Sequence, residues 1–137
     1  MSDYTQLPPP ARHTVLLVDD DARVRYTLTL LMRWSGAWQV IGEAEDGATA
    51  LDLAGARDPD LVLLDLWLPD GDGLSLLPRL RALQPPPLVV LLTAEPADGM
   101  RERALALGAA AYLAKTMPPD ELLAALQTLF DRDGIAR

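Results

Sequence analysis

The residue types best able to do chemistry in this sequence follow short apolar runs. Four runs each end in carboxylates, a hydroxyl or an ammonium: Asp19, Asp20 and Asp21, then Asp65, then Thr93, and finally Lys115. Clustered carboxylates repel one another unless a hard divalent cation such as Mg²⁺ lies among them. A carboxylate can also accept a phosphoryl group, which a metal ion, a lysine and a hydroxyl then stabilise. The set therefore predicts magnesium-assisted phosphoryl chemistry.

Each of these residues also has a purely structural interpretation. An Asp after a strand often caps the next helix, and for Asp21 this role is as plausible as a functional one. Asp70 and Asp72 belong to a turn, where a structural role is favoured and Asp72 is expected to cap a helix. Thr93 alone predicts only a strand-end hydroxyl, and Lys115 alone a surface charge. The functional hypothesis depends on their combination.

The chain can combine these residues only if its apolar runs end at one place. The runs predict strands, and the segments of helical periodicity between them predict helices. The expected strands are Thr14–Val18, Trp38–Ala44, Leu61–Leu64, Leu88–Leu92 and Ala110–Ala114, and the expected helices are Ala22–Trp34, Gly47–Arg57, Leu74–Leu83, Met100–Leu107 and Pro119–Phe130. Wholly apolar strands are typical of a parallel sheet with helices on both faces. We therefore predict an α/β fold, a three-layer doubly wound parallel sheet, with its site beyond the carboxyl ends of the strands.

A few single residues carry further expectations. Pro78 lies inside the third expected helix and should kink it or delay its start. Gly108 should cap the fourth helix. His13 is expected to be exposed, whereas Trp34 and Trp38 are expected to pack in or against the core.

Composition excludes several classes of protein. The 137 residues include 20 acidic and 12 basic side chains, a net charge of −8, which disfavours nucleic-acid contact by this domain. The absence of cysteine excludes disulfides and thiolate sites. No apolar run is long enough to cross a membrane and no signal peptide is visible, so we expect a cytoplasmic protein without membrane contact.

Four motifs resemble those of the receiver domain of bacterial two-component response regulators. They are VLLVDDD at 15–21, DLWLPDGDG at 65–73, LLTA at 91–94 and GAAAYLAK at 108–115. The resemblance covers residues 13 to 131 and implies the flavodoxin-like strand order 2-1-3-4-5. It divides the chain into an N-terminal leader (1–13), the receiver domain (14–131) and a C-terminal tail (132–137).

The resemblance implies a role for each site residue. Asp65 would be the phosphoacceptor. Asp20 and Asp65 would bind Mg²⁺, together with Asp19, directly or through water, and the backbone carbonyl of Trp67. Lys115 would pair with the phosphoryl group. Thr93 would donate a hydrogen bond to it, and Tyr112 would move inward as an aromatic switch.

The resemblance also implies partners and a mode of action. A sensor histidine kinase would supply the phosphoryl group, and an output domain or partner protein, or a homodimer formed on phosphorylation, would receive the signal. The domain would be a signalling phosphoacceptor that assists its own phosphorylation and dephosphorylation, not an enzyme. We further predict that Trp67, with Glu95 on the facing loop, restricts attacking water. Thr116 stands where the family often has proline.

The sequence leaves two alternative functions open, and also whether the chain is part of a longer protein. A magnesium-dependent phosphohydrolase of the haloacid dehalogenase type also uses an aspartyl phosphate, but the sequence lacks the Thr or Val of its motif after the first strand. A pseudo-receiver that binds without phosphorylation is the second alternative. The chain is either a stand-alone receiver or part of a longer regulator with a DNA-binding domain.

Overall fold

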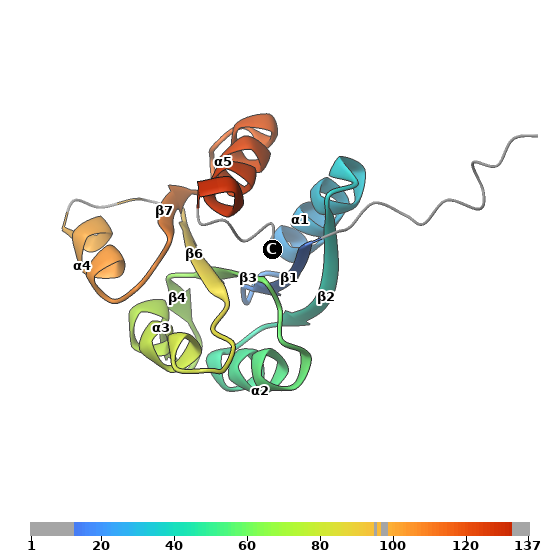
Figure 1. The fold of residues 1–137 in the computed structure, drawn as a ribbon. Coiled ribbons are helices and arrows are strands. Elements are labelled where there is room, and N and C mark those ends of the chain that lie inside the picture. Colours follow the sequence, from blue (N-terminus) through green and yellow to red (C-terminus); the bar gives the residue numbers. More distant parts are fainter. Residues whose placement is uncertain (1–12, 95, 97–98, 133–137) are drawn as a thin grey trace, which may run out of the picture.

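The computed structural model describes residues 13–94, 96 and 99–132, which form one sheet between two layers of helices (Figure 1). The elements are β1 His13–Val18, α1 Ala22–Ser35, β2 Trp38–Ala44, α2 Gly47–Arg57, β3 Leu61–Asp65, β4 Trp67–Leu68, β5 Gly71–Asp72, α3 Gly73–Arg81, β6 Leu88–Thr93, α4 Met100–Ala106, β7 Ala111–Ala114 and α5 Pro119–Arg132. The five long strands are parallel in the order β2-β1-β3-β6-β7. This is the predicted order 2-1-3-4-5, so the predicted fold class is confirmed.

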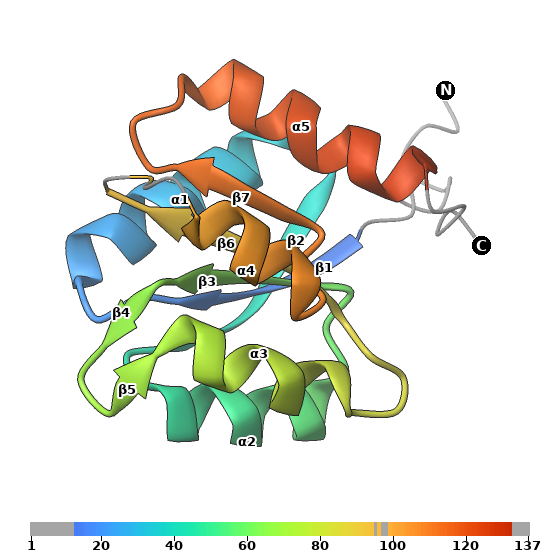
Figure 2. The same cartoon turned by 90° about the vertical axis from the view of Figure 1, so that its left-hand side faces the viewer.

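Each face of the sheet has its own hydrophobic core. Leu16 and Val18 of β1 pack in a cluster with residues of α2, α3 and α4, whereas Val15 and Leu17 pack in a second cluster with residues of α1 and α5. Figure 2 shows α5 on one side of the sheet and α2 and α3 on the other. Because successive residues of a strand point to opposite faces, a wholly apolar strand supplies both cores. Among the described helices, none is long and apolar enough to cross a membrane.

The segment after β3 was predicted only as a turn. It contains a two-stranded antiparallel hairpin in which Trp67 pairs with Asp72 and Leu68 with Gly71. The hairpin leads directly into α3, which begins at Gly73 and includes Pro78. The delayed helix start that Pro78 suggested is therefore not observed. Gly108 follows α4 with φ of 107°, as its predicted capping role requires.

Two aromatic predictions were wrong. His13 was expected to be exposed, but it belongs to β1 and is partly buried, and the centre of its ring lies 5.2 Å from that of Trp38 and 4.4 Å from that of Phe130, in tilted contacts. Trp34 was expected to pack in or against the core, but 78% of it is exposed on α1. Trp38 is buried as predicted. The residues differ because β2 and α5 close over the start of β1, whereas Trp34 lies on the side of α1 that faces away from the sheet.

Candidate functional site

The register of the sheet brings the predicted site residues to one edge. Val18 pairs with Leu64, so the residues that follow them, Asp19 and Asp65, leave neighbouring strands side by side. On the other side of β3, Asp65 pairs with Leu92, the residue before Thr93. The backbone N–H of Lys115 donates to the carbonyl of Thr93 at 2.8 Å, which fixes the end of β7 against the end of β6.

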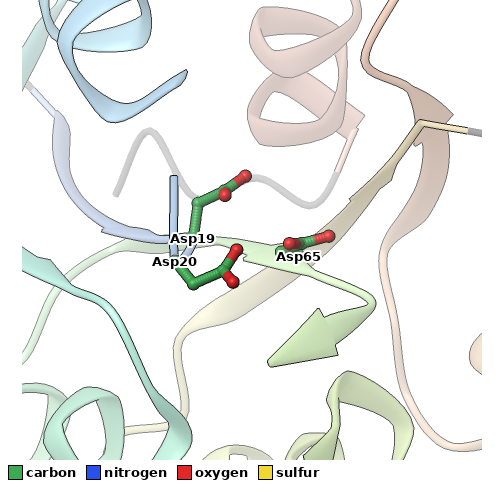
Figure 3. Close-up of side chains that lie close together, drawn as sticks. All are labelled: Asp19, Asp20 and Asp65. Atoms are coloured by element: carbon green, nitrogen blue, oxygen red, sulfur yellow. The ribbon is translucent and has the colours of Figure 1, made fainter. Parts of the chain in front are cut away.

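Three carboxylates converge at this edge. Asp19, Asp20 and Asp65 each offer an oxygen, and these oxygens lie within 4.8 Å of one another. Figure 3 shows the side chains of Asp20 and Asp19 and that of Asp65 gathered beyond the ends of β1 and β3. Asp19 and Asp65 are buried, whereas Asp20 is exposed. The cluster therefore has one open side from which an ion or a phosphodonor can approach.

Lys115 supplies the positive charge beside this cluster. Its Nζ lies 2.6 Å from Oδ2 of Asp19 and 3.3 Å from Oδ1 of Asp65. Burial alone would lower the pKa of Lys115, but the hydrogen bond and charge of Asp19, together with the charge of Asp65, outweigh burial and raise it. The ammonium therefore stays charged at neutral pH. The residue Thr116 after it does not prevent Lys115 from reaching the cluster.

The environment of Asp65 disfavours its ionised form, whereas that of Lys115 favours its charged form. Burial and the charge of Asp19 raise the pKa of Asp65, and Lys115 only partly offsets them. A buried carboxylate with little solvation is a stronger nucleophile than a hydrated one, provided that a cation keeps it ionised. The ionised form of Asp65 therefore depends on nearby positive charge.

Thr93 and Tyr112 belong to β6 and β7, the two strands that lie on the other side of β3 from β1. Thr93 is buried at the end of β6, beside the start of the loop after β3 that Asp65 begins. Tyr112 is buried in β7, and the guanidinium carbon of Arg101 lies 5.8 Å from the centre of its ring. The ring is therefore buried in this structure, and its role as a switch stays a prediction.

The other acidic candidates have structural roles. Asp21 caps α1 by accepting the backbone N–H of Arg23, and that hydrogen bond lowers its pKa. Asp72 caps α3 by accepting the N–H of Ser75 at 2.8 Å, as predicted. Asp70 reaches another element, because its carboxylate accepts the N–H groups of Gly47 and Ala48 at the start of α2. Sequence reasoning placed Asp70 in a turn and missed this partner.

Trp67 stands beside the acceptor on the loop that follows it. Its backbone N–H donates to Oδ1 of Asp65 at 3.5 Å, and 60% of the residue is exposed. Glu95, which the sequence paired with Trp67, lies outside the described residues. The close approach of the loop is fixed by Gly73, where a Cβ atom would lie 2.7 Å from the backbone oxygen of Asp65.

The donor set fits Mg²⁺. Carboxylate oxygens on an open edge are the ligands that this ion combines with water and phosphate oxygens. The three carboxylates are within bridging reach of one ion, and Lys115 balances only part of their charge. A divalent cation would therefore relieve the remaining repulsion.

Comparisons with known proteins identify the family. The model of the response regulator receiver domain matches residues 15–127. The transcriptional regulatory protein PdtaR of Mycobacterium tuberculosis is 35% identical over 118 residues, 86% of this chain and 57% of that protein. YdfI of Bacillus subtilis, a transcriptional regulatory protein, is 35% identical over 108 residues, 79% of this chain and 50% of that protein.

Similar solved structures support the same family assignment. The signal receiver domain of NarL from M. tuberculosis superposes with a TM-score of 0.82 at 34% identity, covering 87% of this chain and 96% of that one. A two-component response regulator of the LuxR family from Aurantimonas gives 0.83 at 26% identity, covering 88% and 86%. The chain belongs to the response regulator receiver domain family and is the receiver domain of a two-component response regulator. It spans about half the length of the curated relatives that it matches.

Proposed function

We propose that Asp65 is the phosphoacceptor of this receiver domain and that a sensor histidine kinase is its phosphodonor. The observation that carries the proposal is the position of Lys115, whose ammonium lies within 3.3 Å of a buried Asp65 oxygen in an otherwise acidic cluster. In the transfer, a carboxylate oxygen of Asp65 attacks phosphorus while the phosphorus–nitrogen bond of the donor phosphohistidine breaks. The bond's electron pair remains on the imidazole nitrogen.

The surrounding residues stabilise the charge that the new group brings. Lys115 would turn from the unphosphorylated carboxylate of Asp65 to one oxygen of the new phosphoryl group. The Thr93 hydroxyl would donate a hydrogen bond to a second phosphoryl oxygen. Asp19, Asp20, Asp65 and the backbone carbonyl of Trp67 would hold Mg²⁺. When bound, Mg²⁺ neutralises phosphoryl oxygens and the carboxylates beside them. The single lysine of the chain thus serves as a compact charge at the point of transfer.

Phosphorylation would act by changing the conformation of the domain. The negative charge of an aspartyl phosphate would draw Thr93 and Lys115 toward it, and the packing of Tyr112 would couple β7 to that movement. We propose that the signal passes in the cytoplasm to an output domain or partner protein, with no nucleic-acid or membrane contact by this domain. No turnover of a chromogenic phosphate ester is expected, because the domain is proposed to be a phosphoacceptor and not a hydrolase.

A labelling experiment tests the proposal. Wild-type protein incubated with Mg²⁺ and a small phosphodonor should gain one phosphoryl group by intact mass, and chelation of Mg²⁺ should prevent it. Asp65→Asn should abolish the gain, whereas Asp52→Asn, on the exposed side of α2, should leave it unchanged. Labelling of Asp65→Asn at the wild-type level would refute the assignment.

A further inference from the structure

The strand β2 holds Asp19 in place without contributing a side chain to the acidic cluster. The other four parallel strands each end at or beside a site residue, whereas β2 ends in Glu43 and Ala44. The register of the sheet pairs Val18 with Ala44, and the backbone N–H of Asp19 donates to the carbonyl of Ala44 at 3.0 Å. The amide side of Asp19 is therefore tied to the end of β2.

The carbonyl of Asp19 is tied to the same strand through a side chain of α1. A guanidinium N–H of Arg25 donates to this carbonyl, and the Nε–H of Arg25 donates to Oε1 of Glu43 at 3.0 Å. The side chain of Arg25 is 15% exposed and that of Glu43 is 45% exposed. Buried backbone groups need hydrogen-bond partners, and both backbone groups of the buried Asp19 find partners that depend on β2.

The stability of the isolated helix does not explain an arginine at this position. Arg25 lies in the first turn of α1, where the helix dipole disfavours a positive charge and no acidic residue is present. Its contacts outside the helix, with Asp19 and Glu43, account for its placement instead. A planar guanidinium can donate to two acceptors at once in a fixed geometry, which a lysine ammonium cannot do.

We infer that Arg25 is a positioning residue that holds Asp19 and Asp20 for the Mg²⁺ site of the proposed function, on which this inference rests. The carbonyl of Asp19 belongs to the planar peptide that joins Asp19 to Asp20, so its contact with Arg25 fixes the peptide from which Asp20 extends. Asp20 is exposed, so its backbone rather than packing around it sets the direction of its carboxylate. Both carboxylates reach the cluster from this one peptide (Figure 3). Arg25 thereby helps to hold two of the three carboxylates within reach of one ion.

A charge effect and a positioning effect of Arg25 predict opposite changes in Mg²⁺ binding. The positive charge of Arg25 repels a cation, so if charge alone mattered, Arg25→Ala would bind Mg²⁺ more tightly and Arg25→Lys would match the wild type. If Arg25 acts by position, both variants should bind Mg²⁺ more weakly, because neither can bridge the Asp19 carbonyl and Glu43 with a planar group. Loss of a residue that orients metal ligands typically lowers metal affinity about 10–100-fold. We expect roughly the lower value, because the Asp19 N–H keeps its bond to β2.

Isothermal titration calorimetry of the full chain with Mg²⁺ alone measures this affinity. Arg25→Ala should weaken binding by roughly 10-fold, and Arg25→Lys should weaken it as well. Arg57→Ala is the matched control, because the guanidinium of Arg57 also donates to a carbonyl of β2, that of Ile41 near the middle of the strand. This control should bind Mg²⁺ as the wild type does. The inference is overturned if Arg25→Ala binds Mg²⁺ as tightly as the wild type or more tightly, or if Arg57→Ala loses as much affinity.

Amide hydrogen exchange in EDTA separates a failure of this inference from a failure of the proposed metal site. Without Mg²⁺, Arg25→Ala should speed exchange at the amides of Asp19 and Asp21, whereas Arg57→Ala should leave both unchanged. The first amide bonds to the Ala44 carbonyl and the second to a carboxylate oxygen of Asp19, so both report on the position of Asp19. Faster exchange in Arg25→Ala, with no Mg²⁺ binding by the wild type, would overturn the metal site but not the hold of Arg25 on Asp19. Unchanged exchange would overturn the positioning role even if the wild type binds Mg²⁺.

Discussion

Asp20→Asn tests whether the carboxylates of the site repel one another in the absence of a cation. Their oxygens lie within 4.8 Å, where two unit charges in water repel by about 0.9 kcal/mol. Asp20 is exposed, so the value for water applies, and it faces both Asp19 and Asp65. The Lys115 ammonium, 2.6 Å from Asp19 and 3.3 Å from Asp65, balances about one of the two negative charges that Asp20 faces, so about one repulsion remains. We therefore expect the variant to gain about 1 kcal/mol in free energy of unfolding, or about 3–5 °C in Tm, in the absence of divalent cations.

Urea unfolding with EDTA and with Mg²⁺ measures this effect. In EDTA, Asp20→Asn should be more stable than the wild type. In Mg²⁺ the order should reverse or the gap should close, because the ion stabilises only the protein that binds it. Asp52→Asn, an exposed carboxylate of α2 away from the site, should show neither effect. The reasoning is refuted if Asp20→Asn is no more stable than the wild type in EDTA, or if Mg²⁺ stabilises both to the same extent.

Three further predictions concern the loop after the acceptor. Trp67→Ala should shorten the lifetime of the phosphorylated protein, because the exposed ring would no longer restrict water, and equal dephosphorylation rates would contradict this. Asp70→Asn should lower the free energy of unfolding at neutral pH. Two N–H donors of α2 depress the folded pKa of Asp70, so its stabilisation is present above the unfolded pKa and is lost as the pH falls through the folded one; urea titrations of both proteins should therefore converge in acid. Gly73→Ala should cost about 1–3 kcal/mol, since its Cβ would press on the Asp65 carbonyl, whereas Gly55→Ala, with no atom nearer than 4.0 Å, should stabilise by about 0.4–1 kcal/mol; equal effects in thermal melts would exclude the clash.

The long strands and helices were predictable because their signals are local. Apolar runs mark the strands, and caps such as Asp72 and Gly108 mark helix ends within a few residues. The hairpin of β4 and β5 was not predictable from periodicity, because each of its strands has only two residues. Its existence depends on the backbone pairing of Trp67 with Asp72.

The candidate site was predictable as a set but not in its supporting contacts. Parallel strands place their ends at one edge, so the convergence of Asp19, Asp65 and Lys115 follows from the order of the elements. The tie between Asp70 and α2 joins residues 22 and 23 positions apart, and no local pattern marks such a contact. The sequence also could not show that Trp34 is exposed, because exposed and buried residues of a helix can follow the same spacing.

The most direct test of the central claim is to locate the phosphoryl group by chemistry specific to an acyl phosphate. Protein phosphorylated in Mg²⁺ is reduced with borohydride, which converts an aspartyl phosphate to homoserine, and its peptides are sequenced by mass spectrometry. The proposal predicts homoserine at position 65, with Asp19, Asp20 and Asp21 unmodified. Homoserine at one of those three positions, or none anywhere in a protein that has gained a phosphoryl group, would contradict it.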